Sequence, residues 1–374
     1  MKRLIPAIAL CACLVAALVI GPQAGSAKPP VGAPKGFFGI GPQNTLTDRD
    51  LEYMKAGGIE SIRWPLPWNG VQQTQNGGYN WAGFDPVVAI AARHGITVLP
   101  FIYSTPSWIS PKYTTLPVNN AKARGAWTNF LRAAVERYGP GGDFWEEKAP
   151  GVVKYEPAIP LPLPIRTWQI WNEANFFYFA YPASPQRYAK LVQISGPAIK
   201  RVDPGAKVIL SGLFGEPTAR GPKGMPADEF LKAVYRTPGI KSRFDGIALH
   251  PYAVDAETLE ELVESMHEVT VENQDRGVPF YVTEMGWGSE NNFQQVAFEQ
   301  GIRGQVKQLK ASYGYLLENQ RRLNLKQVYW FSWKDLDDTC TFCDSVGLFQ
   351  EGLQFHPKPA WRAFINLTGG RVRP

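Results

Sequence analysis

The stretch that decides the fold runs from Thr167 to Leu210. It opens with Thr-Trp-Gln-Ile-Trp at residues 167–171, continues with an amphipathic run at residues 185–202, and closes with Lys-Val-Ile-Leu at residues 207–210. Two short apolar runs separated by a longer run with helical periodicity are typical of two parallel strands joined by a helix. The same alternation continues in both directions along the chain.

The whole chain can be divided into such units. The predicted strands are residues 37–40, 61–64, 97–102, 167–171, 207–210, 246–249, 280–283 and 328–331. The predicted helices are residues 48–56, 84–94, 121–137, 185–202, 227–235, 257–276, 293–322 and 359–367. Strand-then-helix units repeated eight times in strict order predict an α/β protein with a single (β/α)8 TIM barrel and extended loops.

An open, doubly wound sheet is the alternative architecture, and the 374 residues would also allow two domains. Such a sheet normally carries a glycine-rich phosphate loop after its first strand. Here the first predicted strand ends Gly39-Ile40-Gly41-Pro42, which contains a proline and lacks the third glycine of that loop. The barrel is therefore favoured, and no nucleotide site is expected.

The N-terminus predicts export. Met1-Lys2-Arg3 is positively charged, residues 4–20 are almost wholly apolar, and Gly25-Ser26-Ala27 supplies the small residues of a cleavage site. We therefore interpret residues 1–27 as a removed signal peptide, residues 28–36 as a Pro/Gly-rich tether and residues 37–374 as the barrel. An uncleaved membrane anchor is the competing interpretation, because an apolar run of about 17 residues is borderline for spanning a bilayer.

Composition excludes several classes of protein. With 44% apolar and 19% charged residues the chain is not disordered. Removal of residues 1–27 leaves 37 basic and 33 acidic side chains with no dense basic stripe, so nucleic acid is not an expected partner. The 12 Trp, 15 Tyr and 20 Phe residues are numerous enough for some rings to serve as ligand-stacking surfaces.

Two carboxylates stand where a barrel places its chemistry, at the C-terminal ends of strands. The fourth predicted strand ends Trp171-Asn172-Glu173, and the seventh ends Thr283-Glu284. Carboxylates on nearly opposite strands can face each other across the barrel mouth, and glycosidic cleavage needs such a pair, one protonated and one ionised. A glutamate directly after a buried strand is costly to enclose without a partner, which favours a site over a core role.

The sequence resembles the retaining glycoside hydrolases of clan A, which include cellulase-like and β-xylosidase-like enzymes. Their barrels carry Asn-Glu at the end of strand four and Glu at the end of strand seven. The segments that carry the resemblance, in the correct order over most of the mature chain, are Ile62–Trp64, Ile170–Glu173, Leu249–Tyr252, Val282–Glu284 and Tyr329–Trp333. Many members have proline after Asn-Glu, whereas this chain has Ala174, which leaves the subfamily open.

The resemblance implies a role for each matching residue. Glu173 would be the acid/base, Glu284 the nucleophile, and Asn172 the partner of the sugar 2-hydroxyl. Arg63 would help to hold Glu284 ionised through its positive charge. Without the resemblance, Asn172 would be interpreted as a turn residue, and Arg63 equally well as a buried salt-bridge partner.

Two further roles come from the sixth strand. Tyr252 would donate its hydroxyl to Glu284, and His250 would orient the sugar or the carboxylates. Taken alone, His250 would be interpreted as a core histidine.

Tryptophans are the remaining candidates for the site. The resemblance implies a strand-eight tryptophan as the floor under the reacting sugar. Trp330 and Trp333 have opposite parity, and we favour Trp333 because it lies nearer the rim. Trp108 and Trp287 follow strand ends and are candidates for lining the cleft, whereas Trp64 is expected to be a core or loop anchor.

Cys340 and Cys343 are expected to form a small disulfide in the loop after strand eight, because the chain is expected to be exported. Two cysteines without a nearby histidine cannot complete a zinc site, and His94, His267 and His356 are scattered over other predicted elements. We therefore expect neither a metal nor a cofactor.

Together these observations predict a secreted, monomeric, retaining glycoside hydrolase that cleaves β-linked oligo- or polysaccharides by double displacement. The two carboxyl groups should lie about 5 to 5.5 Å apart, whereas a separation near 8 Å would imply inversion. A transglycosylase with the same residues and a non-catalytic carbohydrate-binding protein are the alternatives. The sugar stays open, as does the choice between endo and exo action, which depends on loops such as residues 214–226 and the cystine loop.

Overall fold

The computed structural model describes residues 33–146, 159–291, 296–337, 340 and 342–374. The predicted signal peptide, its alternative as a membrane anchor, and most of the tether lie outside these residues. Among the helices that are described, none combines the length and the apolar character needed to cross a bilayer.

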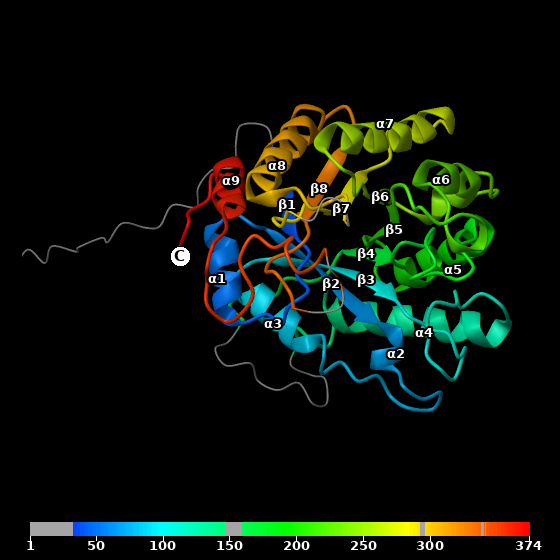
Figure 1. Ribbon diagram of the computed structural model, residues 1–374. Helices are drawn as coiled ribbons and strands as arrows, with labels where there is room; N and C mark the ends of the chain where they lie inside the picture. Colours follow the sequence, from blue (N-terminus) through cyan, green and yellow to red (C-terminus); the bar gives the residue numbers. More distant parts are fainter. Residues whose placement is uncertain (1–32, 147–158, 292–295, 338–339, 341) are drawn as a thin grey trace, which may run out of the picture.

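Eight parallel strands close into a barrel in which each strand pairs with the next along the chain and β8 pairs with β1 (Figure 1). The strands are β1 Phe38–Ile40, β2 Ser61–Pro67, β3 Thr97–Tyr103, β4 Thr167–Ile170, β5 Lys207–Phe214, β6 Gly246–His250, β7 Phe280–Met285 and β8 Leu325–Trp330. The chain is therefore a single (β/α)8 TIM barrel, as the strand order of the sequence predicts.

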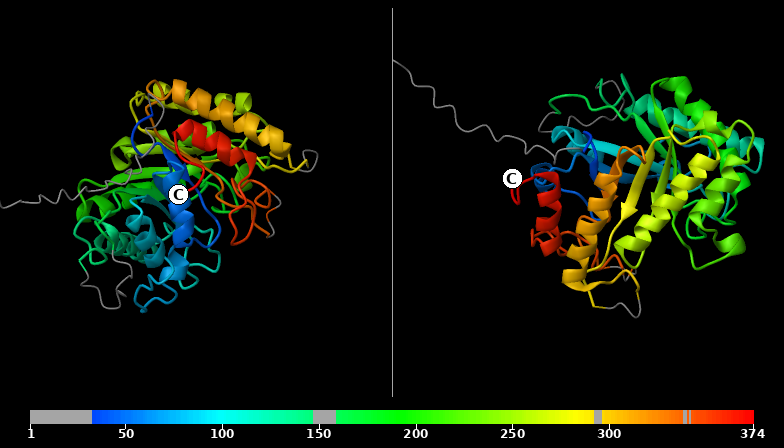
Figure 2. Two further views of the ribbon diagram at one scale, coloured as in Figure 1. Left: turned by 90° about the vertical axis from the view of Figure 1, so that its left-hand side faces the viewer. Right: turned by 90° about the horizontal axis from the view of Figure 1, so that it is seen from above.

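Helices surround the strands on the outside of the barrel (Figure 2). They are α1 Asp48–Ala56, α2 Trp68–Val71, α3 Asp85–Arg93, α4 Ala121–Tyr138, α5 Pro185–Val202, α6 Ala227–Tyr235, α7 Ala256–Glu272, α8 Gly301–Glu318 and α9 Pro359–Thr368, with short 3-10 helices η1 Gly221–Lys223 and η2 Ile240–Arg243. Several begin at side-chain caps: Thr47, Asn120, Ser184 and Asp255 each accept a hydrogen bond from a backbone N–H of the first turn.

All predicted strands and helices are present, and most of their ends agree within a few residues. The largest difference is the predicted helix at residues 293–322, which as α8 begins only at Gly301; residues 293–295 lie outside the described part. Just before α8, Glu299 accepts hydrogen bonds from the Ser345 hydroxyl and the Glu290 backbone N–H. These contacts hold Glu299 in the loops at the barrel mouth, so the helix starts after it.

Side-chain alternation divides the strands into an outer and an inner face. The outward residues join the helices in one large apolar cluster, whereas Leu99, Ile209, Ala248, Tyr281 and Tyr329 form a separate small cluster. Their parity places these five inside the barrel, where they form an apolar floor. The next inward positions toward the C-terminal ends include the polar His250 and Thr283 and the aromatic Phe101 and Phe331, and the candidate site is built at this level.

Candidate functional site

A cavity of about 460 Å³ opens at the C-terminal ends of the strands. Its wall includes Gly41 after β1, Arg63 from β2, Glu173 after β4, Tyr252 after β6 and Glu284 from β7. This is the face of a (β/α)8 barrel where catalytic groups are usually found. The cavity therefore brings together several of the residues that the sequence singled out, from segments that are far apart along the chain.

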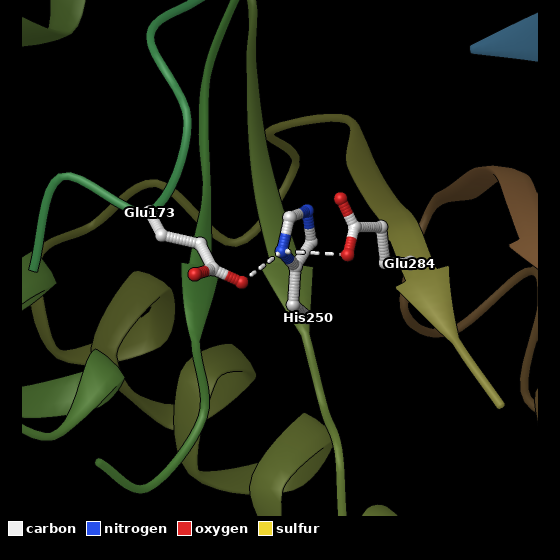
Figure 3. A group of neighbouring side chains, drawn as sticks. All are labelled: Glu173, His250 and Glu284. Carbon is white, nitrogen blue, oxygen red and sulfur yellow. Dashed lines mark hydrogen bonds and ion pairs between the residues drawn. The ribbon is translucent and has the colours of Figure 1, made fainter. Parts of the chain in front are cut away.

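Glu173 and Glu284 point toward each other from opposite sides of His250 (Figure 3). A carboxylate oxygen of each glutamate and a ring nitrogen of His250 all lie within 4.8 Å of one another. Glu173 is 6% exposed and Glu284 9% exposed, and both line the cavity. The two carboxylates are thus close together, nearly buried and still reachable by a ligand in the cavity.

The chain adopts an unusual backbone where it presents Glu173. Trp171 has φ +72° and Glu173 has φ +38°, both in the left-handed region that side chains other than glycine rarely adopt. The surrounding contacts hold this shape: the Trp171 indole donates to the Phe179 carbonyl at 2.9 Å, and the Glu173 backbone N–H donates to the Gly212 carbonyl at 3.1 Å. Such backbone strain persists only where surrounding contacts stabilise it, and it is frequent at functional sites.

Asn175 fixes the loop that follows Glu173. Its side-chain amide donates to the carbonyls of Phe214 at 2.7 Å and Met225 at 2.8 Å, and its Oδ1 accepts from the Phe214 N–H at 2.9 Å. One fully buried amide therefore joins the loop after β4 to both ends of the segment that follows β5.

Arg63, which lies on β2, hydrogen-bonds to three side chains. Its guanidinium donates to Glu284 Oε1 at 2.5 Å, to Asn172 Oδ1 at 2.5 Å and, through Nε, to Gln169 Oε1 at 2.7 Å. The guanidinium carbon also lies 4.0 Å from the centroid of the Phe101 ring. A planar group with donors along several edges suits this geometry, which a lysine could not reproduce.

Glu284 accepts a hydrogen bond on each oxygen. Oε1 receives the Arg63 guanidinium, and Oε2 receives the Tyr252 hydroxyl at 2.8 Å. Burial and the neighbouring Glu284 charge raise the pKa of Tyr252 well above its usual value, so this hydroxyl stays protonated and donates. These two contacts fix the position of the Glu284 carboxylate.

His250, the last residue of β6, lies between the two glutamates. Its Nδ1 lies 2.8 Å from Glu173 Oε1 and 3.6 Å from Glu284 Oε2, and its Nε2 lies 3.0 Å from Thr283 Oγ1. Burial, reinforced by the Arg63 charge, lowers the pKa of His250 well below its usual value, so the imidazole is neutral. Gly212 leaves room for this ring, because a Cβ there would lie 1.9 Å from His250 Nε2.

Glu173 is the carboxyl group of the site that holds a proton. Burial raises its pKa well above the usual glutamate value, and repulsion from Glu284 adds to the rise, while Arg63 opposes it. An ionised Glu284 and a protonated Glu173, with neutral His250, balance the single charge of Arg63. Two carboxyl groups in such unlike environments, side by side, can serve as a proton donor and an attacking carboxylate.

Glu173, His250 and Glu284 also have the spacing of three metal ligands. Their potential ligand atoms already have partners, however, because His250 Nδ1 bonds Glu173, and Tyr252 and Arg63 occupy both oxygens of Glu284. The Arg63 guanidinium supplies the positive charge that a metal would bring. The arrangement fits proton transfer and nucleophilic attack better than metal binding.

None of the four predicted site tryptophans is among the residues that line the cavity. Trp333 is buried, donates to Asp50 Oδ1 at 2.8 Å and packs against Phe349. Trp330 packs against Trp287, and Trp108 donates to the Gln72 carbonyl. The prediction that a strand-eight tryptophan forms the floor under the sugar is therefore wrong for this cavity.

The physical reason is the alternation along β8. Tyr329 belongs to the inner floor and Trp330 faces the helices, so the next inward residue is Phe331, which lines the cavity. Trp333 comes after the strand, where the chain has turned outward toward α1 and α9. Strand parity alone could have pointed to Phe331.

Sequence reasoning also missed other residues of the site. Trp64, expected to be an anchor, lines the cavity, as do Tyr103, Phe214, Phe298 and Phe342. Gln169 and Thr283 lie behind it and hydrogen-bond to each other at 3.2 Å. Gln169 could have been found from the side-chain alternation along β4, because it lies at an inward-facing position, as Arg63 does on β2. The aromatic residues of the loops follow no such pattern.

Cys340 and Cys343 form the expected disulfide. Both half-cystines line the cavity beside Phe342. The bridge therefore fixes part of the rim.

No protein-family model matches this sequence, and no curated protein matches it. Solved structures do match it: a family 39 glycoside hydrolase from Bacteroides cellulosilyticus WH2 has a TM-score of 0.62 at 20% identity, over 89% of this chain and 63% of that one. A monomeric beta-xylosidase from Caulobacter crescentus CB15 has a TM-score of 0.61 at 20% identity, over 91% of this chain and 69% of that one. The GH53 catalytic domain of Ignisphaera aggregans has a TM-score of 0.56 at 17% identity, over 89% and 91% of the two chains.

At these identities the likeness establishes the fold. The chain has the (β/α)8 barrel that these glycoside hydrolases share, and it spans 63% of the first of them.

Proposed function

We propose that this chain is an exported glycoside hydrolase that cleaves β-linked sugars with net retention. The observation that carries the proposal is the pair formed by Glu173 and Glu284, one carboxylate oxygen of each lying within 4.8 Å of the other; the raised pKa of Glu173 supports its role as the acid. So close an approach favours the separation of about 5 to 5.5 Å between the carboxyl groups of retaining enzymes over the roughly 6.5 to 9.5 Å of inverting ones. The glycoside hydrolases of similar fold support the same assignment.

The first chemical step breaks the glycosidic bond. A Glu284 oxygen attacks the anomeric carbon while Glu173 gives its proton to the leaving oxygen, and a covalent glycosyl ester with Glu284 forms. Because the leaving group departs with that proton, Glu173 is left ionised. Asn172, whose Oδ1 accepts from Arg63, keeps its amide N–H groups free of that contact and available to a sugar hydroxyl.

The second step releases the sugar. Glu173 removes a proton from water, the water oxygen attacks the anomeric carbon from the opposite side, and Glu284 leaves as a carboxylate. Two inversions give net retention, and both glutamates return to their starting protonation states. Arg63 and Tyr252 again stabilise the charge on Glu284.

Export is the remaining part of the proposal. Residues 1–27 have the features of a signal peptide, and a disulfide between Cys340 and Cys343 suits an oxidising compartment. Mass spectrometry of protein secreted by an expressing bacterial host tests it, since cleavage leaves Lys28 as the first residue.

The experiment that tests the activity uses the mature chain, its Glu284→Gln variant and a panel of aryl β-glycosides. The wild type should release the aryl alcohol and form the β-anomer of the sugar first, as followed by proton NMR. Glu284→Gln should lower turnover by roughly 10⁴-fold or more, because the nucleophile is lost. A Glu284→Gln variant that keeps wild-type turnover contradicts the proposal.

Two alternatives are outcomes of the same experiment. If an added sugar acceptor captures most of the glycosyl group, the protein is a transglycosylase that uses the same residues. If the protein binds glycosides and turns none over, it is a carbohydrate-binding protein.

A further inference from the structure

The cavity has two unlike sides. The side formed by β1 to β4 is mixed: beside the apolar Pro42, Pro65, Phe101 and Phe179 it carries groups that can hydrogen-bond to a sugar, namely Gln43, Trp64, Tyr103 and Asn172. The other side, which we name the apolar wall, consists of Phe214, Val296, Phe298, Phe331, Phe342 and the Cys340–Cys343 bridge. The two sides meet at Glu173 and Glu284.

The side formed by β1 to β4 has donors to spare. Within the described part of the chain, neither the Trp64 indole N–H nor the Tyr103 hydroxyl is paired with another protein group. Burial raises the pKa of Tyr103, so its hydroxyl keeps its proton and can donate. Together with the Asn172 amide these groups suit the hydroxyls of one sugar ring.

The apolar wall is one continuous aromatic assembly around Tyr252. The Tyr252 ring centroid lies 5.9 Å from Phe214, 5.8 Å from Phe298, 5.4 Å from Phe342 and 6.2 Å from Phe331. Its hydroxyl already donates to Glu284. The described side chains of this wall therefore offer no free hydrogen-bonding group, and a second sugar placed against them would lose water from its hydroxyls without replacement.

The rings of the wall meet at several angles. Phe331 and Phe342 are parallel to each other within 9° and stand at 89° and 86° to the Tyr252 ring, whereas Phe298 stands at 72° to Phe342. Rings set at these different angles form an uneven apolar surface. Such a surface suits a hydrocarbon or an aromatic group more than a row of hydroxyls.

The wall begins beside the acid. Phe214 is the register partner of His250 between β5 and β6, and His250 Nδ1 bonds Glu173. Glu173 delivers its proton to the leaving oxygen, so the leaving group must extend from the neighbourhood of Glu173. A leaving group that extends toward β5 to β8 lies along the apolar wall.

On the basis of the proposed function, we propose that the substrate is a β-glycoside of one sugar with an apolar aglycone, an aryl or alkyl group, and not a polysaccharide. The sugar binds between Trp64, Tyr103 and Asn172, and the aglycone lies against Phe214, Phe298 and Phe342. The reaction is hydrolysis: the bond between the anomeric carbon and the aglycone oxygen breaks, the aglycone leaves as an alcohol with the Glu173 proton, and water supplies the new hydroxyl of the sugar.

The experiment has two stages, so that the two proposals fail separately. The first stage finds which sugar is released from a panel of aryl β-glycosides, and release from none of them contradicts the proposed function. The second stage keeps that sugar and compares its butyl, hexyl and octyl β-glycosides, whose leaving alcohols are equally acidic. We expect kcat/KM to rise with chain length, by up to about fourfold for each methylene that is buried.

Oligosaccharides of the same sugar are measured alongside. A kcat/KM that does not change with chain length, or a trisaccharide cleaved faster than the octyl glycoside, overturns the inference and leaves the hydrolase assignment in place. Faster cleavage of the octyl glycoside supports it.

Variants connect the effect to the wall. Phe298→Ala and Phe342→Ala should lower the octyl-to-butyl ratio of kcat/KM by at least about threefold, because each removes a ring from the aglycone surface. Val296→Ser is a smaller change at the same wall, and it is the variant to use if either alanine variant fails to fold. It should lower the ratio less. Leu353→Ala is the control, since Leu353 is 83% exposed and does not line the cavity. An equal loss on both substrates in the wall variants contradicts the inference.

Discussion

His250 Nδ1 lies 2.8 Å from Glu173 Oε1, and this hydrogen bond joins the histidine to the carboxyl group. The Thr283 hydroxyl accepts from Gln169 at 3.2 Å and lies 3.0 Å from His250 Nε2, to which it can give its own proton. Nε2 is then the acceptor, and Nδ1 carries the ring hydrogen. In this tautomer Glu173 Oε1 accepts the hydrogen bond, and the acidic proton of Glu173 resides on Oε2, where it is available to a leaving group.

Glu173 should set the alkaline limit of activity. Its pKa is raised by burial and by Glu284, and only its protonated form can act as acid, so kcat/KM should fall as the pH rises through that raised pKa. In Glu173→Ala the limb should disappear for 2,4-dinitrophenyl glycosides, whose leaving group needs no proton. A pH–rate profile of both proteins checks this, and an unchanged alkaline limb in the variant would assign it to another group.

The same raised pKa predicts a pH-dependent stability. A carboxyl group whose folded pKa is raised stabilises the fold at low pH, and this contribution is lost as the pH rises through the folded value. Glu173→Gln removes the titration, so its melting temperature relative to wild type should increase between about pH 5 and pH 8. Thermal melts at both values measure this difference, and a constant difference would mean that Glu173 titrates normally.

Arg63 should not tolerate lysine. An ammonium group cannot bond Gln169, Asn172 and Glu284 together, and a partly broken buried pair is destabilising by about 3 to 5 kcal/mol. We expect Arg63→Lys to lose at least about 100-fold in kcat/KM and to lower the free energy of unfolding. Arg322→Lys, at an exposed ion pair with Glu264, is the matched control and should change stability by less than about 1 kcal/mol.

Gly212 should be required for the position of His250. A Cβ at residue 212 would lie 1.9 Å from His250 Nε2 and 2.5 Å from Thr283 Oγ1, so Gly212→Ala must displace the imidazole. We expect a loss of kcat of roughly 10-fold or more and an altered alkaline limb, because Glu173 loses its partner. Gly314→Ala is the control: nothing lies within 4 Å of its added Cβ in α8, and it should stabilise the helix by about 0.5 to 1 kcal/mol.

Phe331 and Trp333 should separate binding from stability. Phe331→Ala removes a ring from the cavity and should raise KM with a modest effect on melting, whereas Trp333→Phe removes the hydrogen bond to Asp50 in a buried site. The latter should lower the free energy of unfolding by about 1 to 3 kcal/mol and leave KM close to wild type. Denaturant melts and steady-state kinetics distinguish them, and a raised KM in Trp333→Phe would return that residue to the site.

The barrel was predictable from the sequence because each strand and helix carries its own local pattern. The carboxylates were predictable because the rim of a parallel barrel is set by where its strands end: Glu173 comes three residues after β4, and Glu284 is the residue before the last of β7. The tryptophans were misplaced because Trp333 lies beyond β8, where the strand period no longer applies. Phe298 and Phe342 could not be found, since they come from loops whose paths depend on contacts across the whole mouth.

The Asn175 amide has a consequence for anyone who redesigns this protein. It bonds Phe214 and Met225, which flank residues 215–224, and it stands two positions after Glu173. Replacing residues 215–224 with a segment from another protein would therefore displace Glu173, the proposed acid, unless the new segment restores the same carbonyl positions. The two loops form one exchangeable module, and chimeras that keep them together should retain turnover while those that divide them should not.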